Sequence, residues 1–216
     1  DQSFEALEQD CGIKYQDLEV HCQKLSQLRQ KAAQKLEKQL IKELKPLAMA
    51  KVSFECRLSP ISPTAAGADQ VTFYFSPNPG EVAQPLAEIA SGGEMSRFLL
   101  ALKACFTQQQ TTPKTLVFDE IDAGVSGKVA QAIATKLHHL SQYHQVLCVT
   151  HQPLIAAMAD GHFRVTKQVQ SQAKNQKGDR TLVAVESLQH HQKRRDELAQ
   201  LTGGHAAEEA ISFAES

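Results

Sequence analysis

Two adjacent carboxylates are the first candidates for chemistry in this chain. Asp119 and Glu120 directly follow the apolar run Leu116-Val117-Phe118, which predicts a buried strand of a parallel sheet. Open α/β sheets bind ligands at the carboxyl ends of such strands, and Mg²⁺ prefers one or two carboxylates together with phosphate oxygens and water. We therefore predict that Asp119 holds Mg²⁺ and that Glu120 is a general base for water. The alternative is a strand that ends in two solvated acids.

A histidine follows a second predicted buried strand. Residues 145–150 are mostly apolar and lead into His151 and Pro153. A histidine at the carboxyl end of a neighbouring strand would lie in the layer expected for Glu120, where it could form a hydrogen bond with a terminal phosphate. The alternative is a strand-end histidine that bonds nearby backbone.

A glycine-rich turn, Ser91-Gly92-Gly93-Glu94, opens a predicted helix that runs to Phe106. Ser91 suits the N-cap, and Glu94 could complete a capping box. The same geometry presents free N–H groups to a phosphate. The loop after the acidic strand contains Gly124 and Gly127, but it is not a Walker A loop, and the pattern Gly-x-x-x-x-Gly-Lys-Ser/Thr is absent from the sequence.

The elements that must position these residues can be expected from the patterning. In residues 4–44 apolar side chains recur every three or four residues, and from Leu36 to Leu44 they recur every four residues. This pattern predicts a coiled-coil arm or one amphipathic helix packed on the core. Pro46 ends it, so we divide the chain into an arm, 1–46, and a globular lobe, 47–216. Within the lobe we expect the following further elements: antiparallel strands 52–58 and 71–75 around a loop at 60–67, a helix at 128–140, a hairpin of 165–169 with 181–185 around a flexible polar segment 171–179, a helix from 190, a Gly203-Gly204 break and a final helix from 206.

Composition limits the classes of protein. The 216 residues hold 23 Lys and Arg against 24 Asp and Glu, so no overall basic field indicates nucleic acid. Five scattered cysteines without a Cys-x-x-Cys pair predict reduced thiols in the cytoplasm. The sequence shows neither a membrane-spanning run nor a signal peptide. It opens in mid-pattern without an initiator Met, so we expect a segment of a longer protein.

Four motifs in a fixed order resemble the C-terminal half of an ABC-type ATPase head of the SMC-like class. They are residues 91–94 as signature motif, 116–120 as Walker B with its glutamate, 122–127 as D-loop, and His151 as switch histidine. The amino-acid sequences of residues 89–97, 118–127 and 195–204 most resemble those of a bacterial DNA-repair branch of that class. The departure is that Walker A and the Q-loop, which belong to the N-terminal half of such a head, are absent.

The resemblance implies an α/β lobe with a mainly parallel sheet, ATP and Mg²⁺ as ligands, and action on DNA ends or single strands in double-strand-break repair. It implies that two heads enclose two nucleotides. Asp119 would support Mg²⁺, Glu120 would polarise water and His151 would contact the γ-phosphate. The signature residues Ser91, Gly92, Gly93 and Glu94 would bind nucleotide in trans, and Asp122 and Gly124 would lie in the D-loop at the dimer seam. Expected partners are an N-terminal half of the same protein, a second copy and DNA, with no membrane, on the nucleoid in the bacterial cytoplasm.

Two other classes stay open on the sequence. A non-catalytic coiled-coil interaction module with a degenerate head would explain the absent Walker A, but it has no chemical need for Glu120 or His151. The ATPase subunit of a membrane transporter is disfavoured by the arm and by Glu94. In either ATPase case we expect this chain alone to be inactive, because Walker A supplies most phosphate contacts.

Overall fold

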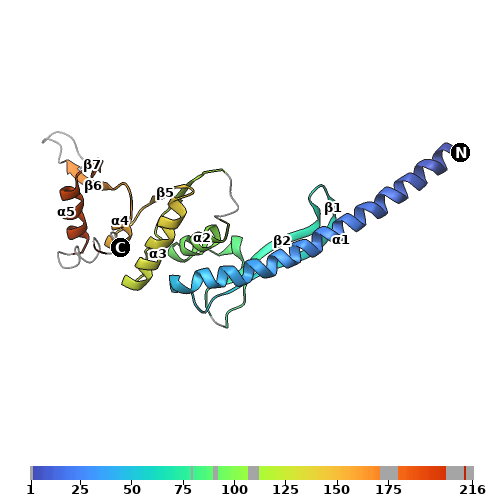
Figure 1. The fold of residues 1–216 in the computed structure, drawn as a ribbon, viewed down its shortest axis with the longest axis horizontal. Helices are drawn as coiled ribbons and strands as arrows, with labels where there is room; N and C mark the ends of the chain where they lie inside the picture. The colour runs from blue at the N-terminus through green and yellow to red at the C-terminus, as the bar shows by residue number, and fades with distance from the viewer. Residues whose placement is uncertain are drawn as a thin grey trace. The chain divides into compact units, whose positions relative to one another are not determined.

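The computed structural model describes residues 2–78, 80–89, 92–106, 112–170, 180–202 and 212. They form two units, Asp1–Gln109 and Gln110–Ser216. Figure 1 labels many of the helices and strands of each. The mixture of helices with antiparallel and parallel strands agrees with the predicted α/β class.

The first unit begins with one long helix, α1 (Gln2–Leu44), of 43 residues. Its sequence contains a single glycine and no proline, so nothing interrupts it. A short 3-10 helix, η1 (Lys45–Leu47), contains Pro46, and Ala48 then adopts a left-handed backbone with φ of 62°. The helix therefore ends where the proline predicts. The apolar side chains exposed along its first part are Phe4, Leu7, Ile13, Tyr15, Leu18, Val20 and Leu28, whereas Ala33, Leu40 and Leu44 are buried.

The first two of three antiparallel strands pack beside the second part of α1 (Figure 1). The three strands are β1 (Ser53–Thr64), β2 (Gly67–Ser76) and the short β3 (Gln84–Pro85), in the order β1-β2-β3. The predicted antiparallel pair is confirmed, but the predicted loop at 60–67 is wrong. β1 continues through Pro60 and Pro63 to Thr64 because it is an edge strand, where a residue without an N–H donor is tolerated, and its register shifts between Pro60 and Thr64.

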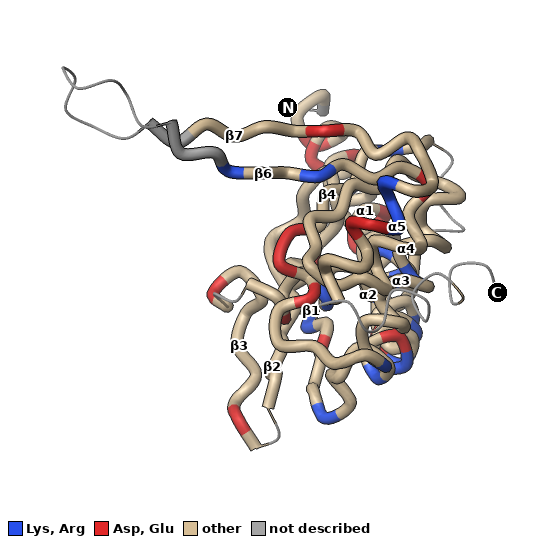
Figure 2. The backbone as a smooth tube through the Cα atoms, turned by 90° about the vertical axis from the view of Figure 1, so that its left-hand side faces the viewer, with Lys and Arg blue, Asp and Glu red and all other residues tan. Residues whose placement is uncertain are grey.

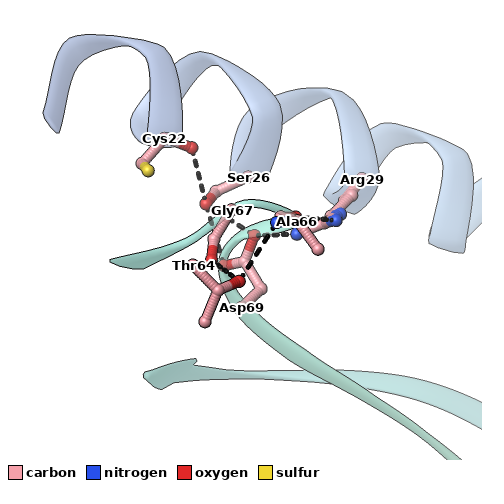
Figure 3. A network of polar contacts seen from close by, with 7 residues as sticks. All are labelled: Cys22, Ser26, Arg29, Thr64, Ala66, Gly67 and Asp69. Carbon is pink, nitrogen blue, oxygen red and sulfur yellow. Dashed lines mark hydrogen bonds and ion pairs between the residues drawn. The ribbon is translucent and has the colours of Figure 1, made fainter. Parts of the chain in front are cut away.

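The tip of the β1–β2 hairpin is fixed to α1 by a polar cluster (Figure 3). The Ser26 hydroxyl lies 2.8 and 2.7 Å from the two carboxylate oxygens of Asp69, and Arg29 Nη1 lies 3.1 Å from Asp69 Oδ2. Arg29 Nη2 donates to the carbonyl of Ala66 at 2.5 Å. Gly67 has φ of 103°, and a Cβ there would lie 2.7 Å from Leu25 Cδ2. The hairpin can approach the helix this closely because position 67 has no side chain.

Helix α2 (Gly93–Phe106) follows the 3-10 turn η2 (Leu86–Glu88) and closes the core of this unit. The Phe98 ring lies against Phe75, with centroids 4.9 Å apart, and against Phe54 at 5.7 Å. Leu100 and Ala101 of the same helix are fully buried. The sequence correctly predicted that this helix starts at the glycine turn and continues through Phe106.

The second unit is built on two parallel strands, β4 (Thr115–Phe118) and β5 (Gln145–Cys148), connected through helix α3 (Gly127–Ser141). The parallel pairing confirms the prediction. The expectation that these strands are buried is only half right, because Val117, Leu147 and Val149 are 67%, 49% and 63% exposed. Alternation along the strands places these side chains on one face, while Phe118 on the other face is buried.

The remaining elements of this unit are helix α4 (Pro153–Ala157), the hairpin of β6 (Phe163–Gln170) with β7 (Arg180–Ser187), and helix α5 (His191–Leu201). The predicted hairpin is confirmed. Figure 2 shows β6 and β7 side by side, with basic residues on β6 and an acidic residue on β7. The predictions for 171–179, for the break at 203–204 and for the helix from 206 lie outside the described residues, except for Ser212. In the described part of the chain, every helix is too short or too polar to cross a membrane.

Candidate functional site

The turn after β4 separates the acidic residues into two environments. Asp119 and Glu120 are exposed, whereas Ile121 is fully buried and Asp122 is 3% exposed. The exposed pair can meet a ligand in solvent, and the buried carboxylate must be satisfied by the protein itself. The strand thus presents the two residues predicted for Mg²⁺ and for base catalysis, while Asp122 points into the unit.

Glu120 has a left-handed backbone, with φ of 54°. Its N–H donates to Asp119 Oδ1 at 2.9 Å, and its carbonyl accepts from the N–H of Ala123 at 3.1 Å. Gly124, with φ of 68°, completes the turn. A non-glycine residue in this region costs on the order of 1–2 kcal/mol, and such strain is concentrated at functional sites. The glutamate predicted as base is therefore held in a conformation that the chain does not favour by itself.

Asp122 joins the ends of the two parallel strands. Its Oδ2 accepts from the Thr150 hydroxyl at 2.5 Å and from the backbone N–H of His151 at 2.8 Å. The His151 ring nitrogen Nδ1 lies 3.1 Å from the same oxygen. The N–H of Val149 also donates to the carbonyl of Phe118 at 2.9 Å. These contacts confirm that the ends of β4 and β5 lie together, as the sequence predicted for the layer of Glu120 and His151.

The His151 ring is held at one nitrogen and open at the other side. The side chain is 71% exposed although Nδ1 faces Asp122. Nδ1 and Nε2 lie on opposite sides of the imidazole ring, so a ring that turns Nδ1 toward Asp122 turns Nε2 away from it. The arrangement therefore orients Nε2 away from Asp122, where it can meet a ligand.

Sequence reasoning gave Asp122 a different role. We predicted it at a dimer seam, and that seam stays a prediction, but in this chain its carboxylate is buried and binds Thr150 and His151. The sequence feature that could have indicated its burial is that Asp122 directly follows the apolar residue Ile121 in a tight turn. Thr150 was also missed, although its hydroxyl both donates to Asp122 and accepts from the N–H of Gln152 at 3.0 Å.

Cys148, at the end of β5, is not a nucleophile for this site. Burial, followed by the carboxylates of Asp122 and Asp119, raises the pKa of its thiol to about 12. The thiolate is the reactive form of cysteine. The thiol therefore stays protonated at neutral pH, and the chemistry of this edge falls to the carboxylates and the histidine.

The residues of the acidic turn fit a phosphate-bound Mg²⁺. Within the described ranges, no three or more His, Cys, Asp or Glu side chains gather as a metal cage. Mg²⁺ does not need one, since it commonly binds one or two carboxylates and takes its other ligands from phosphate and water. Asp119, an exposed carboxylate at the end of β4, suits that role.

The glycine turn belongs to the first unit. Gly92 and Glu94 are exposed, Gly93 begins α2, and the N–H of Ser96 donates to the carbonyl of Gly92 at 3.1 Å. Ser91 lies outside the described residues, so its predicted roles as helix cap and phosphate donor stay predictions. The exposed start of a 14-residue helix agrees with a surface that can accept an anion.

Comparison with known proteins identifies close relatives over the whole chain. A protein named DNA repair protein RecN from Synechocystis sp. is 57% identical over 223 residues, covering 100% of this chain and 38% of the relative. A protein of the same name from Bacillus subtilis is 36% identical over 232 residues, covering 96% of this chain and 39% of the relative. The chain thus spans less than two fifths of the length of these curated relatives. No family model matches it.

Solved structures give the fold. The crystal structure of the Smc head domain with a coiled coil and joint from Pyrococcus yayanosii matches with a TM-score of 0.51 and 20% sequence identity. The match covers 81% of this chain and 30% of the Pyrococcus yayanosii chain. The similarity extends to an SMC head with its coiled coil, which is the fold class predicted from the four motifs.

Proposed function

The chain is a RecN homologue with the fold of an SMC-type head, and we propose that it is the C-terminal half of a RecN-like ATPase that hydrolyses ATP in DNA double-strand-break repair. We further propose that it acts in the bacterial cytoplasm on the nucleoid, where it binds DNA ends or single strands. The arm is residues 1–46 and the ATPase lobe is residues 47–216.

One observation carries this proposal: Asp122 Oδ2 binds the hydroxyl of Thr150 and the backbone of His151. These contacts bring the end of β5 to the turn that carries Asp119 and Glu120. A base, a metal-binding carboxylate and a hydrogen-bond donor at one edge of a parallel sheet are what hydrolysis of a terminal phosphate requires. If Asp119 and Glu120 were only solvated acids and His151 were unrelated to them, the two strand ends would not need the buried Asp122 carboxylate that joins them.

In the proposed reaction each residue has one role. Asp119 holds Mg²⁺, which when bound neutralises charge on the phosphates. Glu120 accepts a proton from the water that attacks the γ-phosphate. His151 donates a hydrogen bond to the γ-phosphate, and Asp122 keeps the histidine in place.

The phosphate cradle has to come from elsewhere, because no Walker A sequence is present. We propose that an N-terminal half of the same protein supplies it. The exposed face of β4 and β5, with Val117, Leu147 and Val149, supports this. Parallel sheets are found almost only with both faces covered, and two strands alone are marginally stable. The assembled protein, meaning this chain joined to that half, would cover the face.

The arm supports the same division. Its first part exposes Phe4, Leu7, Tyr15 and Leu18, whose spacing places them as an apolar stripe on one face of the helix. We propose that the outgoing helix of a coiled coil covers this stripe. The signature residues Gly92, Gly93 and Glu94, with Ser91, would bind the nucleotide of a second copy in a head-to-head dimer.

The rival function is a non-catalytic coiled-coil module. It predicts no dependence on Glu120 or His151, and no specific observation favours it over the ATPase. Strain at Glu120 argues against it, because a module without catalysis gains nothing from a left-handed glutamate.

The proposal is tested by calorimetry and ATPase assays on this chain and on the assembled protein. We expect no micromolar ATP binding by this chain alone, and Mg²⁺-dependent binding with hydrolysis by the assembled protein. Asp119→Asn in the assembled protein should weaken the Mg²⁺-dependent binding, and Asp160→Asn, an exposed acid elsewhere in the same unit, is the control. An assembled protein that binds no ATP, or micromolar binding by this chain alone, would contradict the proposal.

A further inference from the structure

His151 has few contacts of its own to set its position. Its side chain is 71% exposed, and Asp122 holds it from the β5 side. On the other side Gln152 leads directly into α4, which has Pro153 at its start. α4 has only five residues, so it contains few internal hydrogen bonds and is not stable by itself. Whatever holds α4 therefore also holds the backbone that carries His151.

Arg194 of α5 holds the C-terminal end of α4. Its Nη2 atom lies 2.7 Å from the carbonyl oxygen of Ala157 and 3.2 Å from that of Ala156. The same nitrogen also contacts the carbonyl oxygen of Ala159. The last carbonyls of a helix have no partner inside the helix. A guanidinium suits them because it supplies several donors and a positive charge at the negative end of the helix dipole.

An apolar seam runs beside this polar contact. Ala156 and Ala157 of α4 are buried against Leu198 of α5, and Leu154 and Leu201 pack around them. Leu198 lies four residues after Arg194, on the same face of α5. The guanidinium and the leucine therefore hold α4 together, one through its carbonyls and the other through its side chains.

α5 is itself fixed to the β6–β7 hairpin. Arg164 of β6 pairs with Glu197 of α5 at 3.3 Å and with Glu186 of β7 at 2.7 Å. Lys193 of α5 pairs with Glu186 at 2.8 Å. Burial, and after it the positive charge of Arg194, lower the pKa of His162, which directly precedes β6. α5 is thus a fixed support from which Arg194 reaches α4.

We propose that Arg194 is a positioning residue for the ATPase reaction: it holds α4, and through α4 it holds the backbone of His151 at the nucleotide edge. This inference rests on the proposed function. Arg194 contacts α4, whereas the neighbouring Arg195 is exposed.

The first test needs no catalysis. Amide hydrogen exchange is measured by mass spectrometry on this chain, with Arg194→Ala, Arg194→Lys and the control Arg195→Ala. We expect faster exchange in residues 151–158 for Arg194→Ala, a smaller effect for Arg194→Lys because an ammonium can still donate to carbonyl oxygens, and no change for Arg195→Ala. Equal exchange in Arg194→Ala and Arg195→Ala would overturn the proposed link between α5 and His151.

The second test separates positioning from general stability. In the assembled protein we expect Arg194→Ala to lower kcat by on the order of 10-fold with little change in KM, because a small displacement of a catalytic group is enough to cost that much. In a His151→Ala background the same change should cost almost nothing further. An equal loss in both backgrounds, or a kcat equal to that of Arg195→Ala, would overturn the proposal. If the unmodified assembled protein had no ATPase activity, the proposed function would be wrong, and the exchange experiment would still decide the link.

Discussion

Asp122 Oδ2 lies 2.8 Å from the backbone nitrogen of His151 and 3.1 Å from Nδ1 of its ring. One buried carboxylate oxygen therefore fixes both the backbone and the ring of the predicted switch histidine. Since Thr150 shares the same oxygen, the turn after β4 and the end of β5 are coupled through a single atom. Changes at Asp122 should disturb both strand ends.

Asp122→Ala should destabilise the second unit by roughly 1–3 kcal/mol, because it leaves the Thr150 hydroxyl and the His151 N–H without their acceptor. Asp122→Asn keeps one acceptor oxygen and should cost less. Urea unfolding of this chain measures both, with Asp160→Ala, an exposed aspartate in the same unit, as the control. If Asp122→Ala were as stable as Asp160→Ala, the carboxylate would not couple the two strands.

Glu120→Gly should stabilise the fold while it removes the proposed base. The free energy gained by relieving the left-handed strain exceeds the free-energy cost of the extra backbone entropy that a glycine has in the unfolded chain. The free energy of unfolding should therefore rise by roughly 1 kcal/mol. Ala48→Gly is the matched control, because Ala48 has φ of 62° outside the site and should gain a similar amount. Urea unfolding measures both. A loss of stability in Glu120→Gly alone would mean that the glutamate side chain supports the turn rather than straining it.

Gly67→Ala should loosen the hairpin from α1 (Figure 3). The new Cβ would lie 2.7 Å from Leu25 Cδ2 and 3.0 Å from Arg29 Nη1, so the contacts of Arg29 with Asp69 would have to shift. Gly80→Ala isolates the backbone strain, because Gly80 has φ of 85° and open space around it. We expect a larger loss of thermal stability for Gly67→Ala than for Gly80→Ala. Equal losses would show that the hairpin clamp contributes little.

Ser91→Arg tests the signature motif in trans. Ser91 lies outside the described residues, so this prediction comes from the sequence. A long cationic side chain in a closely packed seam should block ATP-dependent dimerisation and hydrolysis by the assembled protein, while ATP binding by the monomer is retained. Sedimentation and ATPase assays measure this, and a mixture with a Walker-A-deficient protein should regain at most one working site. Loss of monomer binding, or normal dimerisation and turnover, would favour a role for Ser91 as helix cap only.

The parts of the fold that depend on local patterning were predictable. The long helix, the glycine turn before α2, the parallel pair β4 and β5 and the β6–β7 hairpin all follow from periodicity and from turn residues. The strand through Pro60 and Pro63 was not, because prolines usually indicate a loop and only the edge position of β1 makes them acceptable.

The details of the site depend on contacts between distant residues. Thr150 and Asp122 are 28 positions apart, and Arg194 and Ala156 are 38 apart, so no local pattern reveals either contact. The left-handed backbone of Glu120 also has no sequence signal, since glycine and asparagine are the residues that usually indicate it. Residue types predicted the chemistry, and tertiary packing decided how those residues are held.

The most direct measurement is ATP turnover by the assembled protein with Glu120→Gln. Glutamine keeps the size of the side chain but cannot accept the proton, so turnover should fall about 100-fold or more while ATP and Mg²⁺ still bind. ATP-bound head dimers should then accumulate and be visible by sedimentation. Near-normal turnover of Glu120→Gln would place the base elsewhere and contradict the central claim that the acidic turn after β4 carries the catalytic half of an ATPase site.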